Sequence, residues 1–238
     1  MVPREVAGLT LALVLATASA VRAERDATPS GCNGLWRATR SLSEAGDRAS
    51  GDEKIRLLER AIDAGEEAVR RCPERAEPHF WLGASYGRFA EAKGGVTALR
   101  LVGRIRREME ASVRLQPDYA GGDAYLALGR LDLSVPGLFG GSRRRGVGWL
   151  EEGLRVAPGN LDMRLALAEA YLHDGRRAEA IALLRTIVDA PATGTPSEET
   201  RQRALELLEQ EEPRAEAPPA AARPPGLRLE GSTGDSLP

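Results

Sequence analysis

The stretch LDMRLALAEAYLHDGRRAEAIALLRTIV, residues 161–188, decides the fold. Apolar residues recur at helical spacing over residues 161–172 and again over residues 177–188. Gly175 stands between the two segments, where a residue in the left-handed conformation is expected to end the first helix. The stretch therefore predicts two helices joined by a tight turn, which is an antiparallel helical hairpin.

Two phrases of this stretch also occur earlier in the chain. The first consists of a leucine, then a small residue, and a larger residue three positions after the small one. It occurs as Leu82-Gly83-x2-Tyr86, Leu128-Gly129-x2-Asp132 and Leu167-Ala168-x2-Tyr171. The second ends in proline, in Gly65-x2-Ala68-x4-Pro73, Met109-x2-Ser112-x4-Pro117, Leu150-x2-Gly153-x4-Pro158 and the shorter Leu184-x2-Ile187-x3-Pro191. Repetition at this period predicts stacked helical hairpins, because no single hairpin can bury its own apolar face.

The other units extend the same pattern in both directions. The second unit has a returning helix expected over residues 97–115, after Gly94-Gly95, and the third has Ser142 placed to cap its returning helix. A last amphipathic segment, residues 197–210, is expected to cover the final apolar face. The sequence thus predicts an all-α superhelix over residues 32–211, with about four antiparallel hairpins and a C-terminal capping helix.

The fourth unit resembles a known repeat family. The pattern Leu167-Ala168-x2-Tyr171-x3-Gly175-x4-Ala180-x3-Leu184-x2-Ile187 is similar to the tetratricopeptide repeat. The small residues Ala168 and Ala180 are expected where the two helices cross, because short side chains allow the backbones to approach. The resemblance implies a concave surface that mediates protein–protein interaction.

Residues 78–190 also resemble a more specific family, the periplasmic T-component of TRAP transporters. The similarity is carried by Gly121-Gly122-x2-Tyr125-x2-Leu128-Gly129, Val135-Pro136-Gly137-x2-Gly140-Gly141, Leu150-x3-Leu154 and Leu167-Ala168-x2-Tyr171-Leu172. The resemblance implies an accessory role beside a periplasmic solute-binding protein. That family is typically lipid-anchored, whereas no cysteine directly follows the N-terminal apolar run of this chain, so an exported tetratricopeptide protein of another kind is the competing interpretation.

The two ends of the chain differ from the repeats. Residues 1–23 are interpreted as a signal peptide, with Arg4, an uncharged run over 9–20, and two small-x-small cleavage sites ending at Ala20 and Ala23. An N-terminal membrane anchor is the alternative. We expect an exported, periplasmic or secreted protein that is soluble after cleavage and has no membrane span in its mature chain. Residues 212–238 are expected to form a disordered Pro/Ala-rich tail.

The chain has two cysteines, Cys32 and Cys72. An exported chain with an even cysteine count permits a disulfide. Cys32 is expected at the start of the first leading helix and Cys72 at the end of its returning helix, and these ends are neighbours in an antiparallel pair. A disulfide between them is therefore the preferred interpretation, with two free thiols as the alternative.

Composition and motifs favour binding over catalysis. The formal net charge of −2 argues against general nucleic-acid binding. The two histidines, His79 and His173, lack metal-ligand spacing, and no nucleophile, base and metal set stands out. We therefore expect a non-enzymatic protein without a cofactor or metal. The preferred function is an exported scaffold for a protein partner, and the alternative is a carrier of a small anionic or hydrophobic ligand.

Two groups are candidate binding residues. Arg143, Arg144 and Arg145 occupy the first turn of a predicted helix, where positive charge is unfavourable, so an anion or acidic partner bound there would resolve the conflict. Trp81 is the second candidate. Because Phe80 and Trp81 are adjacent on a helix and cannot face the same way, we expect one of them to be exposed to the concave groove.

Overall fold

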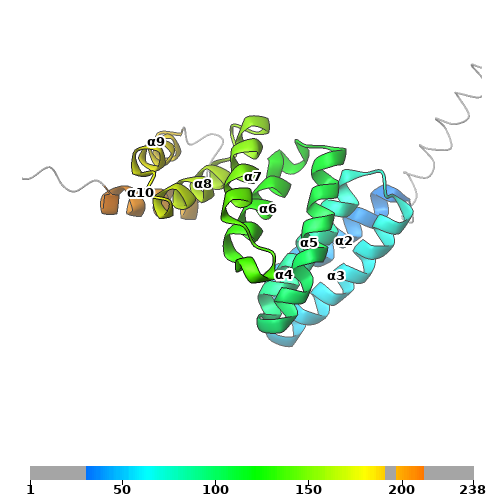
Figure 1. Cartoon of the computed structure of the whole chain (residues 1–238). Helices are drawn as coiled ribbons and strands as arrows, with labels where there is room; N and C mark the ends of the chain where they lie inside the picture. Colours follow the sequence, from blue (N-terminus) through cyan, green and yellow to red (C-terminus); the bar gives the residue numbers. More distant parts are fainter. Residues whose placement is uncertain (1–30, 191–196, 212–238) are drawn as a thin grey trace, which may run out of the picture.

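The computed structural model describes residues 31–190 and 197–211, and these residues form α-helices joined by short connections (Figure 1). Two 3-10 turns, η1 (Tyr119–Gly122) and η2 (Gly137–Phe139), flank the helix α6. The α-helices are α2 (Cys32–Arg48), α3 (Gly51–Arg71), α4 (Ala76–Lys93), α5 (Gly95–Leu115), α6 (Asp123–Ser134), α7 (Arg143–Val156), α8 (Leu161–His173), α9 (Arg177–Val188) and α10 (Glu198–Glu211).

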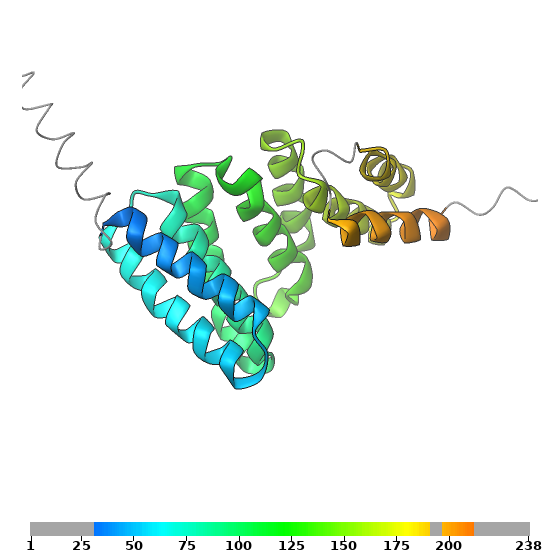
Figure 2. The ribbon, with the colours of Figure 1, turned by 180° about the vertical axis from the view of Figure 1, so that it is seen from behind.

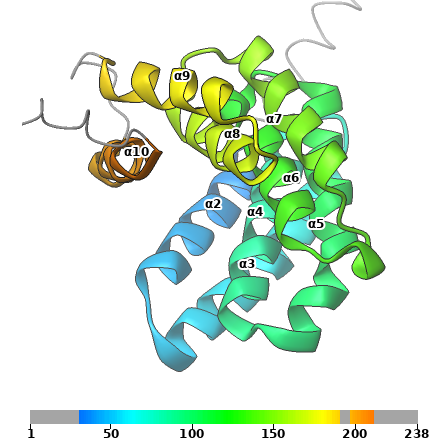
Figure 3. The same ribbon diagram turned by 60° about the vertical axis from the view of Figure 1, so that its left-hand side comes forward.

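Consecutive helices pack as hairpins, α2 with α3, α4 with α5, α6 with α7 and α8 with α9. The hairpins follow one another in chain order, from α2 and α3 at one end to α9 and α10 at the other (Figure 2). The helix α10 packs on α9 and touches α8 (Figure 3). The described residues therefore confirm the predicted superhelix of four hairpins with a capping helix.

The fourth hairpin shows why the sequence folds in this way. Asn160 caps α8, because its side-chain oxygen accepts a hydrogen bond of 2.9 Å from the backbone N–H of Met163. Gly175 has a φ of 74° after the end of α8, as the sequence predicts. Ala168 and Ala180 are fully buried, which agrees with their predicted place at the helix crossing.

The small residue of the first repeated phrase marks a close helix contact in other units as well. A Cβ atom at Gly129 would lie 2.6 Å from Cγ of Leu150, and one at Gly83 would lie 3.0 Å from Cε of Met109. In the second and third hairpins the leading helix thus meets the returning helix at this position. The phrase is therefore a packing signal.

Two groups of buried residues form the core. One is centred on α4 and α5 and includes Leu82, Tyr86 and Met109, and the other extends from α6 to α10. The partly buried side chains of Val113 and Trp149 pack against both groups. The core is therefore continuous between the second and third hairpins, although it consists of two clusters.

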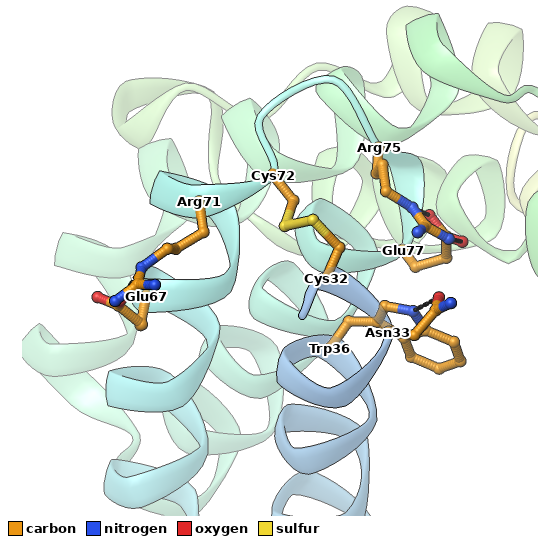
Figure 4. Close-up of a disulfide and its surroundings, with 8 residues drawn as sticks. All are labelled: Cys32, Asn33, Trp36, Glu67, Arg71, Cys72, Arg75 and Glu77. Atoms are coloured by element: carbon orange, nitrogen blue, oxygen red, sulfur yellow. Dashed lines mark hydrogen bonds and ion pairs between the residues drawn. A yellow bond between two sulfur atoms is a disulfide. The ribbon is translucent and has the colours of Figure 1, made fainter. Parts of the chain in front are cut away.

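The first hairpin carries the cysteine pair (Figure 4). Cys32 begins α2 and Cys72 directly follows α3, and the structure joins them in a disulfide with a Cα–Cα distance of 5.9 Å. Cys72 is fully buried, and Cys32 is partly buried. The link connects the N-terminal end of α2 to the turn that leads into α4, which is the arrangement expected for an antiparallel pair.

Two predicted segments lie outside the described residues, namely the signal peptide 1–23 and the tail 212–238. Among the helices of residues 31–190 and 197–211, none is both long enough and apolar enough to cross a bilayer.

Candidate binding site

A groove with a volume of about 760 Å³ lies between α4, α5 and α6. Its floor is largely apolar and comes from one face of each helix. The lining includes Phe80, Ala84, Gly87 and Ala90 of α4, Ala98, Val102 and Ile105 of α5, and Ala127 and Leu131 of α6, with Val135 and Pro136 at one end. The three helices are neighbours in Figure 1, so the groove lies at the joint between the second and third hairpins.

Helix length and residue size explain why this joint is hollow. The helices α4 and α5 have 18 and 21 residues, whereas α6 has 12, so α6 can cover only part of their common face. Small residues occupy the centre of the uncovered part. A Cβ atom at Gly87 would meet no other atom within 4 Å, which shows that the space beside α4 is open.

Charged side chains stand at the edges of the groove. Arg88 pairs with Asp47 at 3.6 Å, whereas Glu91 and Arg130 form no ion pair with another described residue. Burial raises the pKa of Asp123, and a hydrogen bond of 3.0 Å from Asn160 opposes this rise. Arg130 also lines two smaller hollows, one between α6, α8 and α10 and the other between α6, α7 and α8. A ligand in the groove would therefore find an apolar floor with separated positive and negative groups.

Of the adjacent residues Phe80 and Trp81, only Phe80 is among the residues that line the groove. Both are buried, with exposed fractions of 8% and 9%. The indole N–H of Trp81 donates to the hydroxyl of Tyr119 at 3.0 Å, and the guanidinium of Arg40 lies 5.2 Å from the ring centre. Trp81 therefore packs against α2 and Tyr119, whereas Phe80 contributes to the groove lining.

The arginines at the start of α7 have partners inside the protein. Arg143 pairs with Asp174 and donates to the carbonyl oxygen of Ala170 at 2.6 Å. Arg145 pairs with Asp132, and Arg144 is exposed and forms no ion pair with another described residue. Since internal carboxylates already balance two of the three charges, the electrostatic reason for predicting an anion at Arg143–Arg145 no longer holds.

Asp132 is the centre of a clamp that the sequence did not reveal. Its side chain is fully buried and accepts hydrogen bonds from Arg106 at 3.0 Å and from Arg145 at 2.5 and 2.6 Å. Both arginines also donate to the carbonyl oxygen of Gly140. Burial alone would raise the pKa of Asp132, but the two guanidinium groups hold it below its usual value. We call these residues the Asp132 clamp.

The tyrosines of the first repeated phrase bind the preceding hairpin. The hydroxyl of Tyr86 donates to Glu66 at 2.5 Å, and that of Tyr171 donates to Glu151 at 2.7 Å. Burial and the neighbouring carboxylate raise the pKa of each tyrosine to about 12. The third unit has Asp132 at this position, so the Asp132 clamp stands where the other two units have a tyrosine–glutamate bond.

A buried charged pair joins α4 and α5. His79 Nδ1 lies 2.7 Å from Glu108 Oε2, and His79 Nε2 lies 3.0 Å from the carbonyl oxygen of Pro73. Both neighbours are acceptors, so the imidazole binds them best with both nitrogens protonated. Burial opposes this charge, yet the two hydrogen bonds raise the pKa of His79 above 6.5, while His79 and Arg107 lower that of Glu108 below 4.5 despite its burial.

These shifts predict a pH dependence of stability. The stabilisation of the folded state by protonated His79 is complete below its unfolded pKa of 6.5 and is lost as the pH rises through its higher folded pKa. The stabilisation by ionised Glu108 is lost as the pH falls below 4.5. We expect His79→Gln to lower the free energy of unfolding at pH 6 by about 1–3 kcal/mol, and by less at pH 9. Urea unfolding at both pH values measures this difference. His173→Gln is the control, because that side chain is exposed, and an equal loss for His79→Gln at both pH values would contradict the interpretation.

Within residues 31–190 and 197–211, no group of three or more His, Cys, Asp or Glu side chains is arranged to hold a metal ion. His79 is engaged in the buried pair, and His173 is exposed beside Asp174. The arrangement of the described residues thus offers a groove for binding, and its chemistry is apolar contact with a few charges at the edges.

Residues 16–138 match a protein-family model described as "Regulator of microtubule dynamics protein 1-3", which is more than half of the 238 residues. The chain belongs to this family. The matched region contains all the residues of α4, α5 and α6 that line the groove. A second model, for the tetratricopeptide repeat, matches residues 149–193. This second match includes α8 and α9, where the sequence already resembles that repeat.

Solved structures are similar to this member of the family at low sequence identity. One is described as "Crystal structure of MamA", with 19% identity, a TM-score of 0.44, and coverage of 81% of this chain and 94% of that one. Another is "Crystal structure of YrrB: a TPR protein with an unusual peptide-binding site", with 15% identity, a TM-score of 0.42, and coverage of 73% and 92%. No curated protein sequence matches the chain. The matched tetratricopeptide repeat and the stacked helical hairpins together identify the protein as a tetratricopeptide-type interaction scaffold.

Proposed function

We propose that the protein binds an elongated, largely apolar segment of a partner protein in the groove between α4, α5 and α6. The observation that carries this proposal is an apolar groove at the joint of two hairpins. Glu91 and Arg130 stand at its edges and form no ion pair with another described residue. In protein–protein binding, the buried apolar surface supplies most of the free energy of association, and a few charged groups at its edge determine which partner binds.

The alternative ligand is a small hydrophobic molecule. The largely apolar lining supports it, because pockets for small molecules are mostly apolar with a few polar groups. The groove is also large enough, since such pockets have volumes of about 300–1,000 Å³. We prefer a protein segment because the lining follows the length of α4, from Phe80 to Gly94, as a chain lying along a helix would require.

The place of action is part of the proposal. We propose that the protein is exported and acts outside the cytoplasm. A disulfide between Cys32 and Cys72 supports this, because disulfides persist in oxidising compartments. The accessory role beside a solute-binding protein, inferred from the T-component resemblance, stays a prediction.

Filling the groove tests the proposal. Gly87→Phe places a ring in the open space beside α4 without a backbone penalty, because Gly87 lies in a helix. A photo-cross-linking residue in place of Ala127 should capture the partner from an extract of the source cells, and mass spectrometry identifies it. We expect Gly87→Phe to reduce capture at least tenfold by occupying the groove.

Gly148→Phe is the matched control, because Gly148 is an exposed helical glycine of α7 with open space around it, away from the groove. Unchanged capture with Gly87→Phe would refute the proposal. A small molecule that co-purifies with the wild type and is expelled only by Gly87→Phe would establish the alternative ligand. A solute-binding protein in the cross-link would support the transport role, and a cytoskeletal protein would point to the activity for which the family is named.

A further inference from the structure

Exposed apolar side chains gather on two turns beside the groove. Leu138 and Phe139 on η2 are 91% and 50% exposed, and Val96 in the first turn of α5 is 64% exposed. The remaining strongly exposed large apolar residues of the described chain, Leu115 and Leu205, are less exposed and lie elsewhere. Gly94 and Ala98 line the groove on one side and Val135 and Pro136 on another, so the two turns border the same hollow.

The fold holds Leu138 and Phe139 in this outward position. The backbone N–H of Phe139 donates to the carbonyl oxygen of Pro136 at 2.8 Å, and the Asp132 clamp binds the carbonyl oxygen of Gly140. A Cβ atom at Gly141 would lie 1.6 Å from the carbonyl oxygen of Val135, so the chain crosses itself closely there. The ion pairs of the buried Asp132 thus hold a turn whose tip is an exposed leucine and phenylalanine.

The charges nearest in sequence to the two turns are mostly positive. Lys93, Arg100 and Arg144 are exposed and form no ion pair with other described residues. Glu91 is the opposing exposed acid on this part of α4. Apolar side chains on projecting turns, flanked by unpaired basic residues, match the chemistry of an anionic lipid surface, with acyl chains beneath negative headgroups.

We propose that the turns at residues 93–100 and 137–144 form a membrane-contact site. Leu138, Phe139 and Val96 enter the interfacial region of the bilayer, while Lys93, Arg100 and Arg144 bind anionic headgroups. A lipid surface fits better than a protein partner, because Leu138 projects almost completely into solvent and needs no matching cavity. This membrane-contact site is distinct from the groove in which the partner binds. Its contact with the bilayer would place the groove next to the membrane.

A fluorescent label at the tip tests the proposal on the full chain. Both native cysteines are joined to each other, so Leu138→Cys provides a unique thiol for the environment-sensitive dye NBD. The probes are vesicles of phosphatidylcholine alone and of phosphatidylcholine mixed with phosphatidylglycerol. We expect the emission to shift to shorter wavelength with the mixed vesicles, and the apparent affinity to fall at least tenfold when Phe139→Ser, or Arg100→Gln with Arg144→Gln, is added.

A label at Leu205→Cys is the matched control, because Leu205 is an exposed apolar residue of α10 and should report no insertion. Since the label reports only its own position, binding through any other part of the chain would not imitate the result. An unchanged emission at position 138 would overturn the proposal. A shift that needs no vesicles and grows with protein concentration would also overturn it and indicate contact with a second copy of the chain. Gly87→Phe should leave the shift unchanged, which separates this site from the groove.

Discussion

Replacing Asp132 by alanine is expected to lower the free energy of unfolding by about 3–5 kcal/mol, because it leaves Arg106 and Arg145 facing each other without their buried carboxylate. The carboxylate of Asp132 is fully buried, and it is the acceptor that both guanidinium groups share. The change also frees the carbonyl oxygen of Gly140 from a fixed pair of donors. Urea unfolding followed by circular dichroism measures the loss.

Two variants make this experiment specific. Asp174→Ala removes the carboxylate of the Arg143 pair, whose side chains are about one-third exposed, and should cost no more than about 1 kcal/mol. Asp132→Asn keeps the shape of the side chain and loses only its charge, so its loss should be intermediate. If Asp132→Ala and Asp174→Ala had the same small effect, the clamp would be an ordinary surface ion pair.

Removing the disulfide by Cys32→Ser with Cys72→Ser is expected to cost about 4 kcal/mol in the chain-entropy account of such links. The two cysteines are separated by 40 residues, and the link restricts the unfolded chain over that whole loop. Fraying of the first hairpin should follow, because α2 packs mainly on α3 and has nothing before it among the described residues. Thermal unfolding of the oxidised wild type and the double variant measures the difference.

Reduction provides the control for this second prediction. A reductant should lower the midpoint of the wild type towards that of the double variant and should not change the variant itself. Mass spectrometry of the untreated protein after alkylation would show no modified cysteine if the bond is present. Equal midpoints for the wild type with and without reductant, together with two alkylated cysteines, would contradict the disulfide.

The repeats could be predicted from sequence because their signals are local. Helical spacing, Gly175 and the small residues at the crossings each act within one hairpin, and the observed helix α9 (Arg177–Val188) agrees with the prediction in both bounds. Ser142 caps α7 as predicted, since its side chain accepts a hydrogen bond from the backbone N–H of Arg145. Local chemistry of this kind needs no knowledge of neighbouring units.

The charged residues were harder to interpret because their partners are distant in sequence. Asp132 lies 26 residues from Arg106 and 13 from Arg145, and His79 lies 29 residues from Glu108. The sequence shows an unfavourable run of arginines at the start of α7 but not the carboxylates that face it. The partner of Trp81 is also distant in sequence, since Arg40 of α2 lies over its ring.

The groove depends on the relative lengths and placement of three helices, and periodicity within one hairpin does not determine these. The signal that could have indicated it is the cluster of small residues Gly83, Ala84 and Gly87 on α4. Gly83 proved to be a contact point with α5, whereas Gly87 faces open space. The same residue type therefore has two different roles at positions only about one helical turn apart.

The Asp132 clamp has a consequence for the thermodynamics of ligand capture. The tyrosine–glutamate bonds each connect two helices, whereas the clamp connects α5, α6, α7 and the turn that carries Val135 and Pro136 at the end of the groove. This wall is therefore rigid before any ligand arrives. A preorganised wall loses little conformational entropy on association, so the affinity of the groove should depend mainly on the contacts it makes.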